Sequence, residues 1–436
     1  MRFLLGLTLA LTACAETIPL SLQKAVEIAL APDGAARAQL AAEQIRAADA
    51  RAKQARAALL PNVDGSLNYR NQTTNLGAFG IQFPSIPGFQ FAQIVGPFSV
   101  YDLRGNVTQS VFDFSSIRRF QAGKLGIATA KADNQAARDA VADGVARAYL
   151  AALRTEASRD TQKANVELSE ALLRLAQSQK NAGTGLAIEV TRAQVQLAND
   201  KQRLVVATSE VERAHLQLLR VMGLKLEAAP ELTDKMIYQP VDPAETAKAL
   251  DTAREKRAEL DAQFKRVETA RLNYSASKFE RLPTVGFFAD YGTIGSSAAD
   301  AHPTYTYGMS IRVPLYNGGR TDARRAESAS LLRSEEIRGR DLRNQIDLEV
   351  RLALEDLRSA AGQVDVSKEG LQLAENELAQ ARRRYEGGVA NSIEVTDAQT
   401  RLQRARDNQI AAIYNHNLAR IELASATGKI QESLVH

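Results

Sequence analysis

The sequence predicts an α+β protein in which very long helices accompany a few short strands, and the whole is built from an internal two-fold repeat. Residues 181–194 return as residues 386–399 at a constant offset of 205 positions. Residues 98–229 and 315–436 contain no proline and are rich in Ala, Leu, Gln, Glu, Arg and Lys, the strong helix formers. Four short segments alternate between apolar and polar residues, the period of a strand.

The repeat extends over more than a hundred residues. The same offset relates Val145 to Val350, Leu218 to Leu423 and Gly223 to Gly428, and it relates the run 188–191 to the run 393–396. Compositional accident does not produce such a series of identities. We therefore predict an internal duplication and interpret the fold from it.

Length, composition and charge limit the classes of function. The 436 residues allow either several domains or two copies of one large unit, and 45% hydrophobic residues are typical of a folded chain. The 55 basic and 51 acidic residues are interleaved along the chain. Nucleic acid is not an expected partner, because its binding requires basic residues clustered on one face.

Residues 1–15 have the pattern of an export signal: a positive Arg2, an apolar core over 3–11 and then small residues. Two processing patterns fit. The run 11–14 resembles a lipobox, in which Cys14 is a candidate for lipidation, and ordinary signal-peptidase cleavage fits equally well. Because Cys14 is the only cysteine, intramolecular disulfides are excluded.

Helices and strands follow in an order that proline positions mark. Ser21 is the expected N-cap of a helix over 22–31, and a second helix over 33–60 ends where Pro61 forces an extended backbone. The alternating segments are residues 63–69, 101–108, 285–291 and 305–313. They form two hairpins, about 62–111 and 284–314, and the first has the longer loop.

The four strands, of about 9 to 11 residues each, are long enough to cross a bilayer when tilted. Asp102 and Arg104 belong in water, so one face of the sheet should line a wet space. No segment after the signal approaches the roughly 20 apolar residues of a membrane-spanning helix. Since membrane barrels have about eight strands or more, four strands per chain predict an obligate homo-oligomer.

Four long helices are expected in the proline-free stretches, and the first, of 65 residues, would reach roughly 98 Å at 1.5 Å per residue. They cover residues 116–180, 187–222, 321–386 and 392–427. We predict this division of the chain: signal 1–15, first repeat 16–224 with a tip at 181–188, linker 225–245, and second repeat 246–436 with a tip at 386–393.

Several of these features together resemble the TolC-like outer-membrane efflux channels. They are the export signal, the two helix-hairpin-helix halves, the steps Leu60-Pro61 and Leu282-Pro283 before the strands, the strand ends Phe112-Asp113 and Tyr316-Asn317-Gly318-Gly319, and the paired Gly-turn-Ile-Glu-Val motifs. The resemblance implies a homotrimer whose strands form one transmembrane β-barrel, standing on a long α-helical coiled-coil barrel in the periplasm. Its location would be the bacterial outer membrane.

The implied function is a passive exit duct of a tripartite efflux or type I secretion system. The implied partners are a periplasmic adaptor, an inner-membrane transporter and outer-membrane lipid. No cofactor and no enzymatic activity are expected, because the four histidines lack metal-ligand spacing and no P-loop or nucleophile–base pattern occurs. The alternatives are a periplasmic coiled-coil adaptor or scaffold, which the strands disfavour, and an exported hydrolase.

The resemblance also implies roles for residues at the two tips. Tyr385, Glu394 and Asp397 match gate positions of the second tip, and Glu189 matches their acidic partner in the first. The expected adaptor contacts are Gly183, Thr184, Gly185, Gly387, Gly388, Val389 and Ala390. Ala390 stands where the family has an arginine, so any lock here must use Tyr385, other groups, or packing alone.

The residues themselves support a selective gate. Glu394 and Asp397 are three apart and share a helix face, so three copies would place six carboxylates in one ring, which attracts cations. An ordinary solvated acidic face has the same spacing, and that alternative stays open. The first copy has Arg192 where the second has Asp397, so we expect the second copy to form the gate and the first to support it.

Overall fold

The computed structural model of the chain describes residues 17–80 and 92–434. The predicted signal 1–15 and its candidate lipidation site, Cys14, lie outside the described residues. The chain divides into two compact units. A helical unit takes the described residues up to Gln44, Lys131–Asp261 and those from Arg340 onward, and a sheet unit takes Ile45–Ala130 and Ala262–Gly339. Each unit combines segments of both repeat copies.

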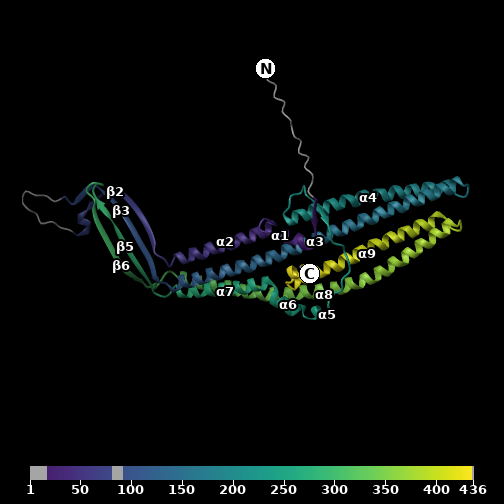
Figure 1. Cartoon of the computed structure of the whole chain (residues 1–436). Helices are drawn as coiled ribbons and strands as arrows, with labels where there is room; N and C mark the ends of the chain where they lie inside the picture. The colour runs from purple at the N-terminus through teal and green to yellow at the C-terminus, as the bar shows by residue number, and fades with distance from the viewer. Residues whose placement is uncertain (1–16, 81–91, 435–436) are drawn as a thin grey trace, which may run out of the picture. The chain divides into compact units, whose positions relative to one another are not determined.

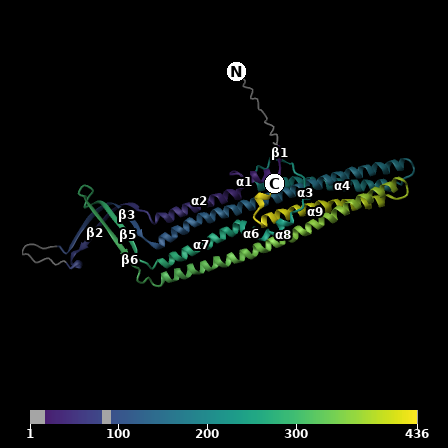
Figure 2. The same cartoon turned by 60° about the horizontal axis from the view of Figure 1, so that its bottom comes forward.

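The long helices confirm the sequence prediction to within two residues at each end. They are α3 (Phe114–Asn181, 68 residues), α4 (Ala187–Met222), α8 (Arg320–Glu386, 67 residues) and α9 (Ser392–Ala426). Within the helical unit, α3 and α4 run side by side as one hairpin and α8 and α9 as another (Figures 1 and 2). No helix in the described ranges combines the length and the apolar character needed to cross a membrane.

The shorter helices begin and end where local chemistry requires. Helix α1 (Leu22–Leu30) has Ser21 as its N-cap, whose side chain accepts a hydrogen bond from Lys24 N. Helices α2 (Ala36–Ala57) and α7 (Ala258–Phe279) each precede a strand. The remaining short helices are η1 (Leu76–Phe79), α5 (Pro243–Ala247), α6 (Ala249–Lys256) and α10 (Ile430–Ser433).

A two-stranded parallel sheet in the helical unit was not predicted. β1 (Thr17–Leu20) pairs with β4 (Ala229–Leu232), which lies inside the segment expected to be only a linker. Four-residue strands are too short to show a period-two pattern, so the sequence carried no signal for them.

Tyr149 of α3 fixes this sheet to the helices. Its side chain is fully buried, and its hydroxyl lies 2.8 Å from the carbonyl oxygen of Leu20 and 3.0 Å from Oδ2 of Asp234. The same Asp234 carboxylate accepts from the backbone N–H of Leu22, which begins α1. Burial raises the pKa of Tyr149, followed by the negative charge of Asp234, so the hydroxyl stays a donor.

The sheet unit holds four antiparallel strands in the order β2-β3-β5-β6, so β2 and β6 are the edges. The strands are β2 (Asn62–Asn75), β3 (Ile94–Phe112), β5 (Thr284–Gly295) and β6 (His302–Arg312). The expected length of 9 to 11 residues was too short for three of them. Pairing of β2 with β3 continues past the alternating segment to Asn75 and Ile94, because backbone hydrogen bonds need no apolar pattern.

The two faces of the sheet differ as the alternation predicts. One face carries exposed apolar side chains, among them Val63, Leu67, Tyr69, Leu103, Tyr291, Tyr305, Tyr307, Met309 and Ile311. The other face is mostly polar, with Phe288 as an exception. There Arg104 of β3 forms ion pairs with Asp102 on its own strand and with Asp290 on β5.

The duplication is visible in the backbone. Helices α2 and α7 both have 22 residues, and β2 and β5 begin at matching positions after them. Gly223 after α4 and Gly428 after α9 both have left-handed φ, of 79° and 72°. A Cβ on Gly223 would lie 2.8 Å from the carbonyl oxygen of Gly34, and one on Gly428 would lie 3.0 Å from that of Lys256. The helix-ending glycines therefore occupy equivalent packing sites.

Tyr149→Phe should lower the free energy of unfolding by about 1–3 kcal/mol, because it leaves the Leu20 carbonyl and one Asp234 oxygen with one donor fewer. Tyr414→Phe is the matched control, since Tyr414 is half-buried and its hydroxyl has no hydrogen-bond partner among the described residues. Urea denaturation of the purified protein measures both. Equal effects would show that the Tyr149 hydroxyl does not hold β1 to α3.

Candidate functional site

The two hairpin tips have the same backbone structure. Gly183 and Gly388 occupy equivalent positions with φ of 76° and 72°, a left-handed conformation that favours glycine. In the first tip the N–H groups of Thr184 and Gly185 both donate to the carbonyl of Gln179. In the second, those of Val389 and Ala390 both donate to Arg384. The tip residues thus form equivalent turns, whatever further role they have.

Burial distinguishes the two copies. Positions on α9 just after the second tip are buried, whereas their counterparts on α4 are half-buried or exposed. The buried set is Val395, Ala398, Gln399 and Leu402, and the counterparts are Val190, Ala193, Gln194 and Leu197. Val395, Ala398 and Leu402 belong to one apolar cluster with Tyr385. The second hairpin therefore packs its return helix inward, which agrees with the expectation that the copies differ.

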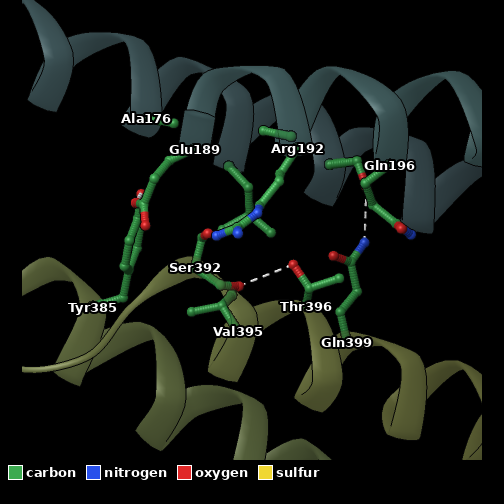
Figure 3. A pocket seen from close by; sticks show the side chains of 12 residues that line it. Ala176, Glu189, Arg192, Gln196, Tyr385, Ser392, Val395, Thr396 and Gln399 are labelled. Atoms are coloured by element: carbon green, nitrogen blue, oxygen red, sulfur yellow. Dashed lines mark hydrogen bonds between the residues drawn. The ribbon is translucent and has the colours of Figure 1, made fainter. Parts of the chain in front are cut away.

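Tyr385, at the end of α8, links the second tip to the first. Its hydroxyl donates to Oε2 of Glu189 at 2.9 Å, and its carbonyl accepts from Nε2 of Gln179. Figure 3 shows the Tyr385 ring reaching toward Glu189. Burial, and then the hydrogen bond and charge of Glu189, raise the pKa of Tyr385 to about 12. The structure therefore brings together two residues that the sequence placed in the gate.

Glu394 and Asp397 have different surroundings. The backbone N–H of Glu394 is capped by Asn391, and its carboxylate pairs with Nε of Arg384 at 2.9 Å. Asp397 is exposed and has no hydrogen bond or ion pair with any described residue. The sequence pattern alone does not identify the group that replaces the arginine absent at Ala390. Arg384, the residue before Tyr385, is the basic group that contacts a tip carboxylate here.

A small cavity of about 30 Å³ lies between the hairpins next to these residues (Figure 3). Its lining comes from α3, α4, the end of α8 and α9, and includes Glu189, Tyr385, Ser392 and Gln399. Ser392 Oγ and Gln399 Oε1 are buried polar atoms without a hydrogen-bond partner within the described chain. Across residues 17–80 and 92–434, no group of three or more His, Cys, Asp or Glu side chains is arranged to hold a metal ion.

Asp200 was not predicted as a functional residue from the sequence. It is fully buried on α4 and accepts hydrogen bonds from Ser169 of α3 and from Gln196 of its own helix. A signal was present in the sequence. Asp200 stands seven residues before Ala207 on the stripe that continues through Val211, so it occupies a core position of the helix.

The architecture matches that of solved outer-membrane channels. The Campylobacter jejuni CmeC outer membrane channel superposes with a TM-score of 0.80 at 15% identity, covering 94% of this chain and 85% of that one. The Vibrio cholerae outer membrane protein VceC gives 0.78 at 18% identity, covering 93% and 96%. The chain thus shares its fold with these solved proteins.

The family follows from the sequence. The family model described as "Outer membrane efflux protein" matches residues 35–224 and 249–429, and the chain belongs to this family. It is similar to the pyoverdine export outer membrane protein OpmQ of Pseudomonas aeruginosa, with 24% identity over 65% of this chain and 60% of OpmQ. The outer membrane efflux protein BepC of Brucella suis is 23% identical over 88% of this chain and 81% of BepC. The resemblance to TolC-like channels is confirmed.

Tyr385→Phe should loosen the second tip because Glu189 loses its donor. The pKa of Tyr385 in the fold, about 12, lies above its ordinary value of 10.0. The stabilisation is therefore fully present below pH 10 and is lost as the pH rises through 12. Thermal unfolding should show a gap between wild type and Tyr385→Phe that is constant up to pH 10 and narrows above it. A gap independent of pH would contradict this role for the hydroxyl.

Proposed function

We propose that the chain is the passive exit duct of a tripartite efflux or type I secretion system in the bacterial outer membrane. Three copies join their sheets edge to edge, and their paired helical hairpins form a tunnel in the periplasm. A periplasmic adaptor contacts the tips, and an inner-membrane transporter supplies the energy. The chain itself performs no catalysis.

The observation that carries this proposal is the four-stranded sheet, which has two open edges and one exposed apolar face. Open edges in lipid leave backbone groups without partners, which costs several kcal/mol for each group. Pairing β6 of one copy with β2 of the next removes both edges. A periplasmic adaptor or scaffold has no use for an apolar sheet face of this kind, so the sheet favours the duct over that alternative.

The cargo is left at the level of efflux or secretion. Relatives of comparable identity are named for different cargoes: one for pyoverdine export, one, AprF of Pseudomonas aeruginosa, for alkaline protease secretion, and one, TtgF of Pseudomonas putida, for toluene efflux. Similarity to these relatives therefore does not by itself define what passes.

At the tip, we propose that the second copy supplies the gate. Tyr385 and Glu189 hold the second hairpin against the first, Arg384 orients Glu394, and Asp397 projects into solvent. In three copies the exposed Asp397 side chains would form the main part of an acidic ring. The tip turns, from Gly183 to Gly185 and from Gly387 to Ala390, are the surfaces offered to the adaptor.

The full-length protein should fractionate with the outer membrane and run on gels as an oligomer that heat converts to monomer. Light scattering of the detergent-solubilised protein should give an oligomer, because only closure between copies removes both sheet edges, and three copies is the number that the resemblance to TolC-like channels implies. A deletion strain supplied with a plasmid copy should regain export of the compounds that accumulate without it. A soluble monomer in the periplasm would overturn the proposal.

Asp397→Asn should lower the cation-to-anion permeability ratio in a planar bilayer by up to about fivefold, since unit charges near contact in water interact with about 1 kcal/mol. Glu394→Gln should have a smaller effect, because Arg384 already offsets that carboxylate. Glu369→Gln removes an exposed carboxylate of α8 farther from the tip and is the control. An unchanged ratio in the double variant Glu394→Gln, Asp397→Asn would remove both residues from the constriction.

A further inference from the structure

A second set of contacts joins the two hairpins, separate from Tyr385 and Glu189. We call Ser169 of α3, Asp200 of α4 and Gln399 of α9 the clasp. Ser169 Oγ donates to Asp200 Oδ2 at 2.5 Å, and Gln399 Nε2 donates to Ser169 Oγ at 2.8 Å and to Asp200 Oδ2 at 3.5 Å. The clasp therefore ties the return helix of the second hairpin to both helices of the first.

All three side chains of the clasp are buried, with 1%, 0% and 3% of Ser169, Asp200 and Gln399 exposed. A buried carboxylate is costly unless donors surround it. Besides Ser169 and Gln399, the donors are Gln196 and Arg203 of α4 itself. This degree of satisfaction is typical of a built site rather than of a charge trapped by chance.

The clasp lies where an apolar residue would ordinarily pack. Asp200 continues the buried stripe of α4 that includes Ala207 and Val211. In packed helices a polar residue at such a position costs stability but specifies which neighbour and which register are allowed. Apolar residues would hold the helices together without fixing their register along the helix axes.

The clasp does not belong to the duplicated plan. At the repeat offset, Ser169 corresponds to Ala374 and Asp200 corresponds to Ala405, both without polar side chains. Gln399 corresponds to Gln194, which is exposed on α4. One junction between the hairpins thus carries polar contacts that its counterpart lacks.

Two further contacts extend the same polar face of α9. Arg203 of α4 donates to Gln403, and Arg406 donates to Oδ1 of Asn165 of α3 at 3.3 Å. Gln399, Gln403 and Arg406 are four and three residues apart, so they share one helix face. The contact of α9 with the first hairpin is therefore directional along two turns.

The clasp is incompletely satisfied at its α9 end. Gln399 Oε1 has no partner among the described residues and lies beside the cavity between the hairpins. A buried network with an unsatisfied member gives up part of its stability. The link to α9 is thus weaker than the Ser169–Asp200 link within the first hairpin, so α9 is the side that releases.

We propose that the clasp is a second latch, which fixes the register of the second hairpin on the first and has to break before the tip opens. This inference rests on the proposed duct function, and Ser169, Asp200 and Gln399 act on the gate by positioning α9. Tyr385 holds the second hairpin at its tip, whereas the clasp holds it farther along, through Gln399 of α9. Opening then requires both latches to release.

The decisive variant is Gln399→Leu, which removes the link to α9 and leaves Ser169 and Asp200 paired. Gln196→Leu is the matched control, because it removes one donor to the same carboxylate without crossing between hairpins. In planar bilayers, Gln399→Leu should raise the open-to-closed ratio by about two- to tenfold, the effect of losing one ordinary hydrogen bond, here to the Ser169 hydroxyl. Gln196→Leu should leave the ratio unchanged.

Replacing the clasp by apolar residues tests whether its polar contacts fix the register of the hairpins or only hold the hairpins together. Ser169→Ala, Asp200→Leu and Gln399→Leu together exchange the polar contacts for packing, which is often neutral for stability. We expect thermally stable oligomers that open more readily and admit a large antibiotic into cells. Stable oligomers as closed as wild type, or equal opening by Gln196→Leu and Gln399→Leu, would overturn the latch. A wild-type oligomer that never conducts would instead contradict the duct itself.

Discussion

The open edges of the four-stranded sheet impose the constraint on which the rest of the structure depends. β2 and β6 each carry a row of backbone groups that β3 and β5 do not use. In lipid those backbone groups need partners from other copies, so a single chain cannot satisfy the hydrogen bonds of its own sheet. Helix α3 begins two residues after β3 ends, so in the proposed duct copies joined through their strands would also contribute helices next to one another. In the proposed duct, the oligomeric sheet and the helical tunnel would therefore follow from one requirement.

Much of this fold was predictable because proline and glycine residues mark the ends of its long helices. The absence of proline from two long stretches and the glycines at 183, 223 and 388 fixed the ends of the long helices to within two residues. Strand ends were less predictable, since pairing of β2 with β3 continues beyond the alternating residues. The pairing of β1 with β4 was not predicted because no local sequence pattern indicates it. The pair is held by a tertiary contact, the hydrogen bond from the Tyr149 hydroxyl to the carbonyl of Leu20.

Some residues near the tips were predictable from the sequence and others were not. Tyr385 and Glu189 were identified from a resemblance, and their side chains meet in the fold. Arg384 and the buried Asp200 were not identified, because their partners come from another helix or from across a turn. Which faces of two helices meet depends on how the hairpins wind around each other, and spacing within one helix does not determine that. Only the place of Asp200 in a core stripe gave a local sign.

The duplication accounts for the difference between the two copies in the gate that we propose. Equivalent turns at Gly183 and Gly388 show that both copies retain the same hairpin, so the difference lies in what surrounds each return helix. The return helix α9 is buried after its tip, whereas α4 at the same positions is not. Because α9 is buried, its side chains can form hydrogen bonds with Ser169 and Asp200. The half-buried or exposed side chains of α4 at the equivalent positions have no such neighbours among the described residues. In the proposed duct, the hairpin that is packed inward would therefore both close the tunnel and be held by the clasp.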